Sequence, residues 1–383
     1  MQLKTLGSFV PATLALACSN AEDPAYDPAT LEAYLRAIPE EARLVADVPT
    51  AEPEPGALTS TGSAVLAREG VKFARAVNEP ARLMVQALRS IVQLPPTFFD
   101  SEKKQFVWGP WENDDGVGDV FVYIQQNAAG EDFEYSYALA RSMQGDLASA
   151  TPVIWGAATP DAADDQKAVG VTLWDLEANH AFELTHDMSA PDQGRGRFVM
   201  VYGHQTEGSR QAFFNVAVFR DFVPGDNPTA DSVDIDYFYG RFLDGSGNSI
   251  DFVETTVSAD ICDAASGTEP PRQACFDDDA VADQDESFHF VSLFINRGFG
   301  RAEATVSGGD VSGEVSMTEC WDPSLDQTFL RVASSASNTE AGSCQAPTDQ
   351  PMSALGLPSF ATLDPALVEK LSCAAEHGVA GCP

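Results

Sequence analysis

Residues 131–142, EDFEYSYALARS, contain the pattern that decides the fold class of this chain. The larger apolar side chains occupy every second position of the stretch, at Phe133, Tyr135, Tyr137 and Leu139. Smaller or polar residues fill the positions between them. A period of two is typical of a β-strand that buries one face and turns the other to solvent or to a cavity. The stretch therefore predicts a half-buried strand.

Similar alternating runs recur from Gln105 to Ala333 and are joined mostly by short turns, such as residues 127–130 and 244–248. About a dozen strands in this arrangement, without the spacing of βαβ units, predict one antiparallel meander. A sheet of this length curls or closes to protect its edges. We therefore predict a mainly β fold with accessory helices, in which the sheet forms a barrel or a strongly curved half-barrel.

Helical patterns flank the strands. Asp27 and Pro28 start a short helix, residues 63–94 carry an amphipathic pattern interrupted near Pro80, and Asp364 caps a last helix. We expect these helices to pack on the sheet or to plug its mouth. The predicted divisions are a signal peptide at 1–17, an N-terminal segment with a short helix and a proline-rich linker at 18–62, amphipathic helices at 63–97, the β domain at 98–335 with a disulfide-stapled insertion at 260–287, and a C-terminal loop and helix at 336–383.

The charge of the chain excludes one class of partner. Asp and Glu number 58 against 22 Lys and Arg, which gives a formal net charge of −36. Such a surface repels the phosphates of DNA and RNA, so we expect no nucleic-acid partner. A solvated acidic surface that keeps the protein soluble is the simplest interpretation of this charge.

The N-terminal residues predict export. The segment MQLKTLGSFVPATLALA carries one charge, Lys4, and an apolar run that is too short to span a bilayer, which is typical of a signal peptide. The run ends Ala15-Leu16-Ala17-Cys18, and small or apolar residues directly before a cysteine resemble the lipobox of bacterial lipoproteins. The resemblance implies that diacylglycerol on Cys18 anchors the mature protein to a membrane of the cell envelope. Ser19 resembles the next residue of lipoproteins sent to the outer membrane. A conventional secretory signal with an incidental cysteine is the alternative.

Six cysteines remain after Cys18, at Cys262, Cys275, Cys320, Cys344, Cys373 and Cys382. An even number in an exported chain predicts disulfides. Neighbours in sequence suggest three bridges, 262–275, 320–344 and 373–382. The metal or redox alternative lacks a C-x-x-C motif and a His-Cys cluster.

Catalytic motifs are absent from the sequence. It contains no G-x-S-x-G elbow, no phosphate-binding G-x-x-x-x-G-K-[ST] loop and no H-E-x-x-H helix, so we expect no enzyme and no cofactor. His180 and His186 lie in an acidic connection that we interpret as a polar loop. The acidic run with Asp277, Asp279, Asp283 and Asp285 offers oxygens for Ca²⁺, but a solvated loop is the favoured interpretation.

Aromatic residues gather in the predicted meander. In a wide barrel one face would line a cavity for an apolar ligand, and the candidate lining residues are Phe133, Tyr135, Tyr137, Leu139, Trp155, Phe198, Tyr202, Tyr237 and Tyr239. In a narrower sheet the same residues are core, which is the default for aromatic side chains.

Three functions stay open. The first is a non-enzymatic envelope lipoprotein that binds an apolar small molecule or lipid within the curved sheet. The second is a structural or interaction lipoprotein with a filled barrel that meets another envelope component. The third is a hydrolase whose carboxylates meet only in the folded chain.

Overall fold

A computed structural model provides the structure of the protein. It describes residues 26–48, 62, 64–113, 117–143, 145, 147–161, 167–186, 194–207, 210–223, 232–243, 248–259, 286–296, 298–309, 311, 313–335, 337–344, 363 and 365–377. The predicted signal peptide, Cys18, the proline-rich linker and the acidic run at 277–285 lie outside the described residues.

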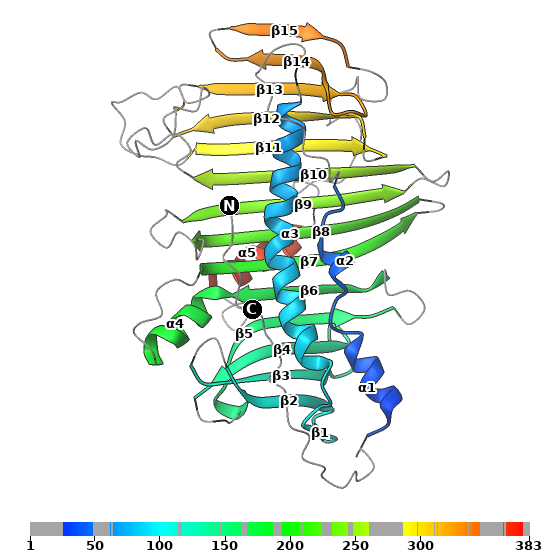
Figure 1. Cartoon of the computed structure of the whole chain (residues 1–383), viewed down its shortest axis with the longest axis vertical. Helices are drawn as coiled ribbons and strands as arrows, with labels where there is room; N and C mark the ends of the chain where they lie inside the picture. The colour runs from blue at the N-terminus through cyan, green and yellow to red at the C-terminus, as the bar shows by residue number, and fades with distance from the viewer. Residues whose placement is uncertain are drawn as a thin grey trace.

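One antiparallel sheet of 15 strands forms the body of the molecule, and its strands follow one another in chain order (Figure 1). The sheet is not closed, as a half-barrel requires, so the predicted antiparallel meander is confirmed and the closed barrel is not formed. The strands are β1 Phe98–Asp100, β2 Gln105–Glu112, β3 Asp119–Gln126, β4 Tyr135–Ser142, β5 Thr151–Thr159, β6 Val169–Asp175, β7 Arg195–Glu207, β8 Arg210–Val223, β9 Val233–Leu243, β10 Ser249–Ala259, β11 Glu286–Ile295, β12 Gly300–Gly308, β13 Glu314–Trp321, β14 Gln327–Ala333 and β15 Asn338–Gly342.

Strand β4 shows how the alternating pattern becomes structure. Tyr137 pairs with Ile124 of β3 and with Gly156 of β5, and its side chain is buried. Phe133 lies just before the strand, because β4 begins at Tyr135. The short edge strands β1 and β15 have no alternating apolar pattern, which is why the sequence did not predict them. With β15 the sheet extends to Gly342, past the boundary expected at 335.

Helix α3, Val65–Val92, crosses the strands and covers one face of the sheet (Figure 1). The predicted interruption near Pro80 is wrong, because the helix runs unbroken through that residue. A proline inside a helix removes one backbone hydrogen bond. The buried face continues on both sides of Pro80, at Val77, Ala81 and Met84, so packing along the sheet outweighs that local cost.

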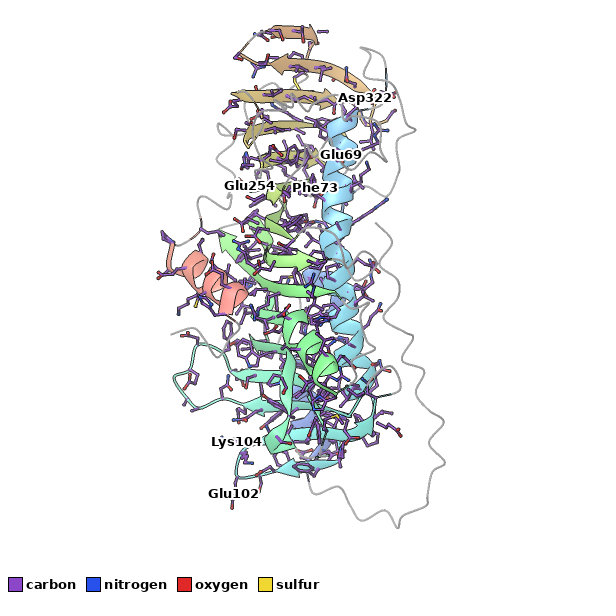
Figure 2. The ribbon with its side chains drawn as sticks, turned by 90° about the vertical axis from the view of Figure 1, so that its left-hand side faces the viewer. Glu69, Phe73, Glu102, Lys104, Glu254 and Asp322 are labelled. Atoms are coloured by element: carbon purple, nitrogen blue, oxygen red, sulfur yellow. A yellow bond between two sulfur atoms is a disulfide. The ribbon has the colours of Figure 1, made fainter. Side chains whose placement is uncertain are left out.

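The other helices are shorter. Helices α1, Pro28–Leu35, and α2, Glu41–Leu44, contribute Tyr34 and Leu44 to the apolar core that α3 forms with the sheet. Asp27 caps α1 as predicted, with its Oδ1 atom accepting from the Ala29 N–H at 3.0 Å. Helix α5, Pro365–His377, lies on the opposite face of the sheet, as Figure 2 shows. The predicted cap Asp364 lies outside the described residues.

Two apolar layers therefore enclose the central strands. The larger lies between α1–α3 and the aromatic face of the sheet. The smaller lies on the other face, where Leu371 and Ala375 of α5 pack on residues such as Val199, Val216 and Val218. A strand in the middle of the sheet is therefore buried on both faces and has little exposed surface.

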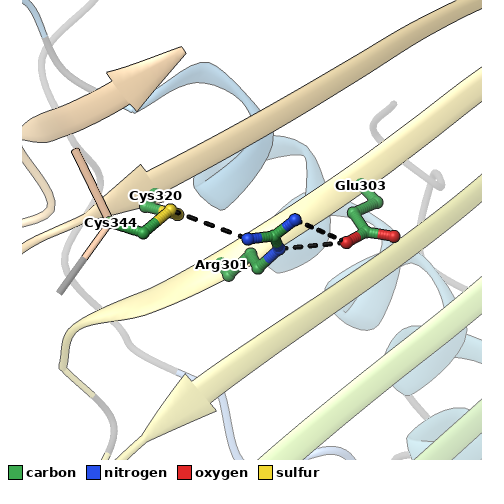
Figure 3. The surroundings of a disulfide bond; sticks show 4 residues. All are labelled: Arg301, Glu303, Cys320 and Cys344. Carbon is green, nitrogen blue, oxygen red and sulfur yellow. Dashed lines mark hydrogen bonds and ion pairs between the residues drawn. A yellow bond between two sulfur atoms is a disulfide. The ribbon is translucent and has the colours of Figure 1, made fainter. Parts of the chain in front are cut away.

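A disulfide joins Cys320 of β13 to Cys344, directly after β15, with a Cα–Cα distance of 5.6 Å. This confirms the predicted 320–344 bridge. The guanidinium of Arg301 lies beside it and donates to the Cys344 Sγ at 3.7 Å and to the Glu303 Oε1 at 2.9 Å (Figure 3). Cys373 is also disulfide-bonded. Its pairing with Cys382 and the 262–275 bridge stay predictions, because Cys262, Cys275 and Cys382 lie outside the described residues.

Candidate functional site

Most of the predicted cavity-lining residues lie in the core beneath α3. Six of them belong to one buried cluster with the helix, namely Tyr135, Tyr137, Leu139, Phe198, Tyr202 and Tyr237. Tyr239 belongs to the same cluster but also reaches the wall of a pocket. Trp155 lies on the opposite face, because it pairs with Ala138 while Gly156 pairs with Tyr137. Phe133 is half-buried before the start of β4.

Two of these tyrosines lie directly over glycines of neighbouring strands. A Cβ atom at Gly156 would lie 2.2 Å from the hydroxyl of Tyr137, and one at Gly170 would lie 2.3 Å from the hydroxyl of Tyr202. The rings thus fill the space that side chains on β5 and β6 would occupy. Burial raises the pKa of both phenols, so they stay protonated at neutral pH. These tyrosines are packing residues.

The pocket that Tyr239 reaches is bounded by a segment we name the strap, residues 41–48, which comprises α2 and the residues after it. Asn78 of α3 holds the strap in place. Its Oδ1 atom accepts from the Ala46 N–H at 2.6 Å, and its Nδ2 atom donates to the Ala46 carbonyl at 2.9 Å. This pair of bonds satisfies both backbone groups of Ala46 in a buried site, so it fixes the strap against the helix.

The pocket between the strap, α3 and strands β7–β9 has a volume of about 560 Å³, and we name it the strap pocket. Sites for small molecules commonly have about 300–1,000 Å³ and combine apolar walls with a few polar groups. The apolar walls here include Val45, Val48, Phe213 and Leu243. The strap pocket therefore has the size of a small-molecule site, with apolar walls on part of its lining.

Arginine is concentrated in the lining of the strap pocket. Four guanidinium groups line it, those of Arg43, Arg75, Arg82 and Arg241, together with a single carboxylate, Asp47. The whole chain carries more than twice as many acidic as basic residues. The lining thus reverses the charge balance of the rest of the sequence.

Contacts with neighbouring residues hold two of these arginines, Arg43 and Arg82, in position. Arg43 donates to the Ala168 carbonyl at 2.6 Å, and its guanidinium carbon lies 5.5 Å from the centre of the Phe213 ring. Arg82 pairs with Glu41 at 2.8 Å and with Glu79 at 3.2 Å. Held guanidinium groups lose less conformational freedom when they bind an anion.

Polar side chains form a partly buried network of hydrogen bonds and ion pairs around Tyr239, at the wall of the pocket. The Tyr239 hydroxyl donates to the Oδ1 atom of Asp251 at 2.8 Å and accepts from the Asp47 N–H at 3.2 Å. Arg241 pairs with the Asp47 carboxylate at 2.8 Å, and its Nε atom lies 3.8 Å from Asp251, which is fully buried. Burial and the neighbouring Asp251 carboxylate raise the pKa of the Tyr239 phenol.

Sequence reasoning named only Tyr239 among these residues. The sequence contained a sign of this site. In β10, Asp251 occupies the same alternate positions as Val253 and Val257, which face the core. In β9, Arg241 occupies the same alternate positions as Tyr237 and Tyr239. A charged residue at an inward-facing strand position is costly unless it is paired. A charged residue at such a position therefore predicts that a polar partner lies nearby.

Glu319 of β13 is the described carboxyl that most resembles a catalytic acid, since burial raises its pKa to about 7. Its two oxygens, however, accept the backbone N–H groups of Val65 at 2.9 Å and Leu66 at 2.5 Å. It therefore caps the N-terminal end of α3. Its contacts give it a structural task and do not support the hydrolase alternative.

The connection with His180 and His186 is helix α4, Leu176–His186, and the prediction of a polar loop is wrong. Glu183 of this helix pairs with Arg141 of β4, and their side chains are only 2% and 4% exposed. Arg141 also donates to the Asn179 Oδ1 at 3.0 Å and lies 4.6 Å from the centre of the Phe182 ring. These contacts to the sheet order the segment as a helix.

No cluster of three or more His, Cys, Asp or Glu side chains suited to a metal occurs among the described residues. The Ca²⁺ candidates Asp277, Asp279, Asp283 and Asp285 lie outside them. Within the described part of the chain, no helix has the length and apolar character needed to cross a membrane.

Comparisons with known proteins give no relative: no family model, no curated protein and no solved structure matches the chain.

Proposed function

We propose that this protein is a non-enzymatic lipoprotein of the bacterial cell envelope that binds an apolar small molecule or lipid in the strap pocket. The observation that carries the proposal is the pocket itself, with apolar walls at Phe213 and Leu243 beside a few fixed polar groups. It lies on the aromatic face of the sheet, but beside α3 and not beneath it.

The proposed location at the outer membrane rests on the sequence. The apolar run that ends at Cys18 resembles a lipobox, and acyl chains on that residue would hold a strongly acidic protein at a membrane whose surface repels it. A precursor with Cys18→Ala is expected to lose acyl labelling and membrane retention. Unchanged retention of that variant in fractionated cells would refute the lipid anchor.

Native mass spectrometry tests the binding function. The full chain with Cys18→Ala, recovered from a bacterial periplasm without detergent, is expected to carry an adduct of lipid mass that organic extraction removes. Leu243→Asp, which places a charge on the apolar wall, is expected to lose the adduct. Glu340→Gln on the distant strand β15 is a control that should keep it. A wild-type protein that carries no adduct, and takes up none when lipid is added, would refute the proposal.

The interaction alternative has an observation of its own. Strand β15 is exposed at all five residues, and among the described strands it pairs only with β14. An edge strand presents backbone groups on which a partner strand can pair. Under this alternative, Glu340→Pro at the edge would abolish capture of an envelope partner while the lipid adduct persists.

A further inference from the structure

One partly exposed charge in the strap pocket is a carboxylate bound to an arginine. The Asp47 side chain is 46% exposed, whereas that of Arg241, its partner at 2.8 Å, is 27% exposed. Asp47 belongs to the strap, so the pair joins the strap to strand β9 of the sheet. The Asp47–Arg241 pair is therefore accessible to an anion that enters the pocket from solvent.

A second guanidinium lies next to this pair. Phe213 of β8 is the cross-strand partner of Arg241 of β9, and Arg43 lies over the Phe213 ring at 5.5 Å. Arg43 and Arg241 therefore flank one aromatic ring. Two fixed guanidinium groups beside an aromatic surface suit a ligand that has a negatively charged head and an apolar body, because charge-assisted hydrogen bonds hold the head and the ring contacts the body.

We propose that the strap pocket selects amphiphiles with a singly charged anionic head, a carboxylate or a phosphodiester, which replaces the Asp47 carboxylate at Arg241. One carboxylate leaves and one anion enters, so the charge around Arg241 and the buried Asp251 is unchanged. A head with no charge cannot replace the Asp47 carboxylate as the counter-ion of Arg241, so it leaves that pair in place and forms no ion pair with either arginine. This inference rests on the proposed function and specifies its ligand class.

The arrangement also makes Asp47 an internal competitor. Ligand binding must break the contact between Asp47 and Arg241, which lowers the apparent affinity for anions. Removing the competing charge should therefore strengthen binding, a result that the loss of a merely structural contact does not produce. Most single substitutions near a binding site weaken binding, so the sign of the effect is diagnostic.

Titration calorimetry with three single-chain probes tests this inference on the full chain with Cys18→Ala. The probes are palmitate, palmitoyl lysophosphatidylglycerol and hexadecanol, each below its aggregation concentration. Palmitate and the phosphodiester are expected to bind at least tenfold more tightly than hexadecanol. The tighter of the two anions distinguishes a carboxylate ligand from a phosphodiester ligand.

Asp47→Asn is expected to tighten anion binding about fivefold, as for loss of an exposed ion pair, and to leave hexadecanol unchanged. Arg241→Gln is expected to weaken anion binding about tenfold. Asp234→Asn is the matched control, because Asp234 is 49% exposed and pairs with Arg220 at 3.8 Å away from the pocket. This variant should leave the affinity for all three probes unchanged.

Two results would overturn the inference. If hexadecanol binds as tightly as palmitate, or if Asp47→Asn leaves anion affinity unchanged or weaker, the pocket does not select an anionic head, although the proposed lipid-binding function stands. If none of the three probes binds, the inference and the proposed function both fail. Because Asp47 is exposed at the surface, its amide variant should fold, and the test does not depend on Arg241→Gln alone.

Discussion

The buried cap at Glu319 predicts an unusual pH dependence of stability. Burial raises the pKa of this carboxyl from 4.5 to about 7, against the opposing effect of hydrogen bonds from Val65 and Leu66. A carboxyl that binds its proton more tightly in the folded than in the unfolded state adds stability below pH 4.5. That contribution is lost as the pH rises through 7.

The magnitude follows from the size of the pKa change. Each tenfold change in proton affinity corresponds to about 1.4 kcal/mol, so the group contributes about 3 kcal/mol at pH 4 that is absent at pH 8. Glu319→Gln is neutral at every pH and keeps one carbonyl oxygen for the N–H groups of α3. The free energy of unfolding of the variant, measured relative to wild type, should therefore rise by about 3 kcal/mol between pH 4 and pH 8.

Urea denaturation followed by tryptophan fluorescence at several pH values measures this difference. Taking variant minus wild type cancels the titration of the many surface carboxyls. Glu314→Gln, an exposed position on the same strand, is the control and should show no such slope. The reasoning would be refuted if Glu319→Gln were destabilised more at pH 8 than at pH 4. In that case the helix N–H groups favour the carboxylate more than burial disfavours it.

Three further tests use substitutions in packed parts of the fold. Arg141→Met leaves Glu183 buried without its cation and should lower the free energy of unfolding by about 3–5 kcal/mol; an effect below 1 kcal/mol would mean that α4 is loosely held. Cys344→Ala removes a bridge between residues 24 positions apart and should lower the free energy of unfolding in urea by about 3 kcal/mol. Under reducing conditions, where wild type also lacks the bridge, the variant and wild type should unfold with the same free energy. Tyr135→Asp places a charge in the core and should unfold the domain by circular dichroism, whereas Ser136→Asp on the opposite face should fold. Equal tolerance of the two would contradict the assignment of faces.

The position of α3 explains why the aromatic face of the sheet does not form the predicted cavity. The helix spans the strands and places an apolar stripe on them, so the volume that an apolar ligand would need at Tyr137, Tyr202 and Tyr237 is taken by the chain itself. Close approach is possible where Gly70 of α3 faces the sheet, because a Cβ atom there would lie 3.0 Å from the Ser292 hydroxyl. A pocket of about 560 Å³ lies beside the helix, under the strap.

The sequence by itself determined the strand pattern. A period of two is a local property of the chain, so the alternation at Tyr135, Tyr137 and Leu139 predicted β4, and similar runs predicted most of the meander. Most neighbouring strands are joined by short connections, which favours pairing in chain order. The bridge between Cys320 and Cys344 could also be predicted, because cysteines that are neighbours in sequence meet readily.

Only the tertiary structure decided where the charges meet. Asp47, Arg241 and Asp251 come from the strap and from two strands, and no local pattern relates a strap residue to a strand nearly two hundred positions later. The same is true of Arg141 and Glu183, whose pairing orders a polar segment as helix α4, and of Pro80, which α3 tolerates because the sheet supports both sides of it. Local periodicity predicts which residues are buried, whereas the pocket depends on long-range contacts whose free energy exists only in the folded chain.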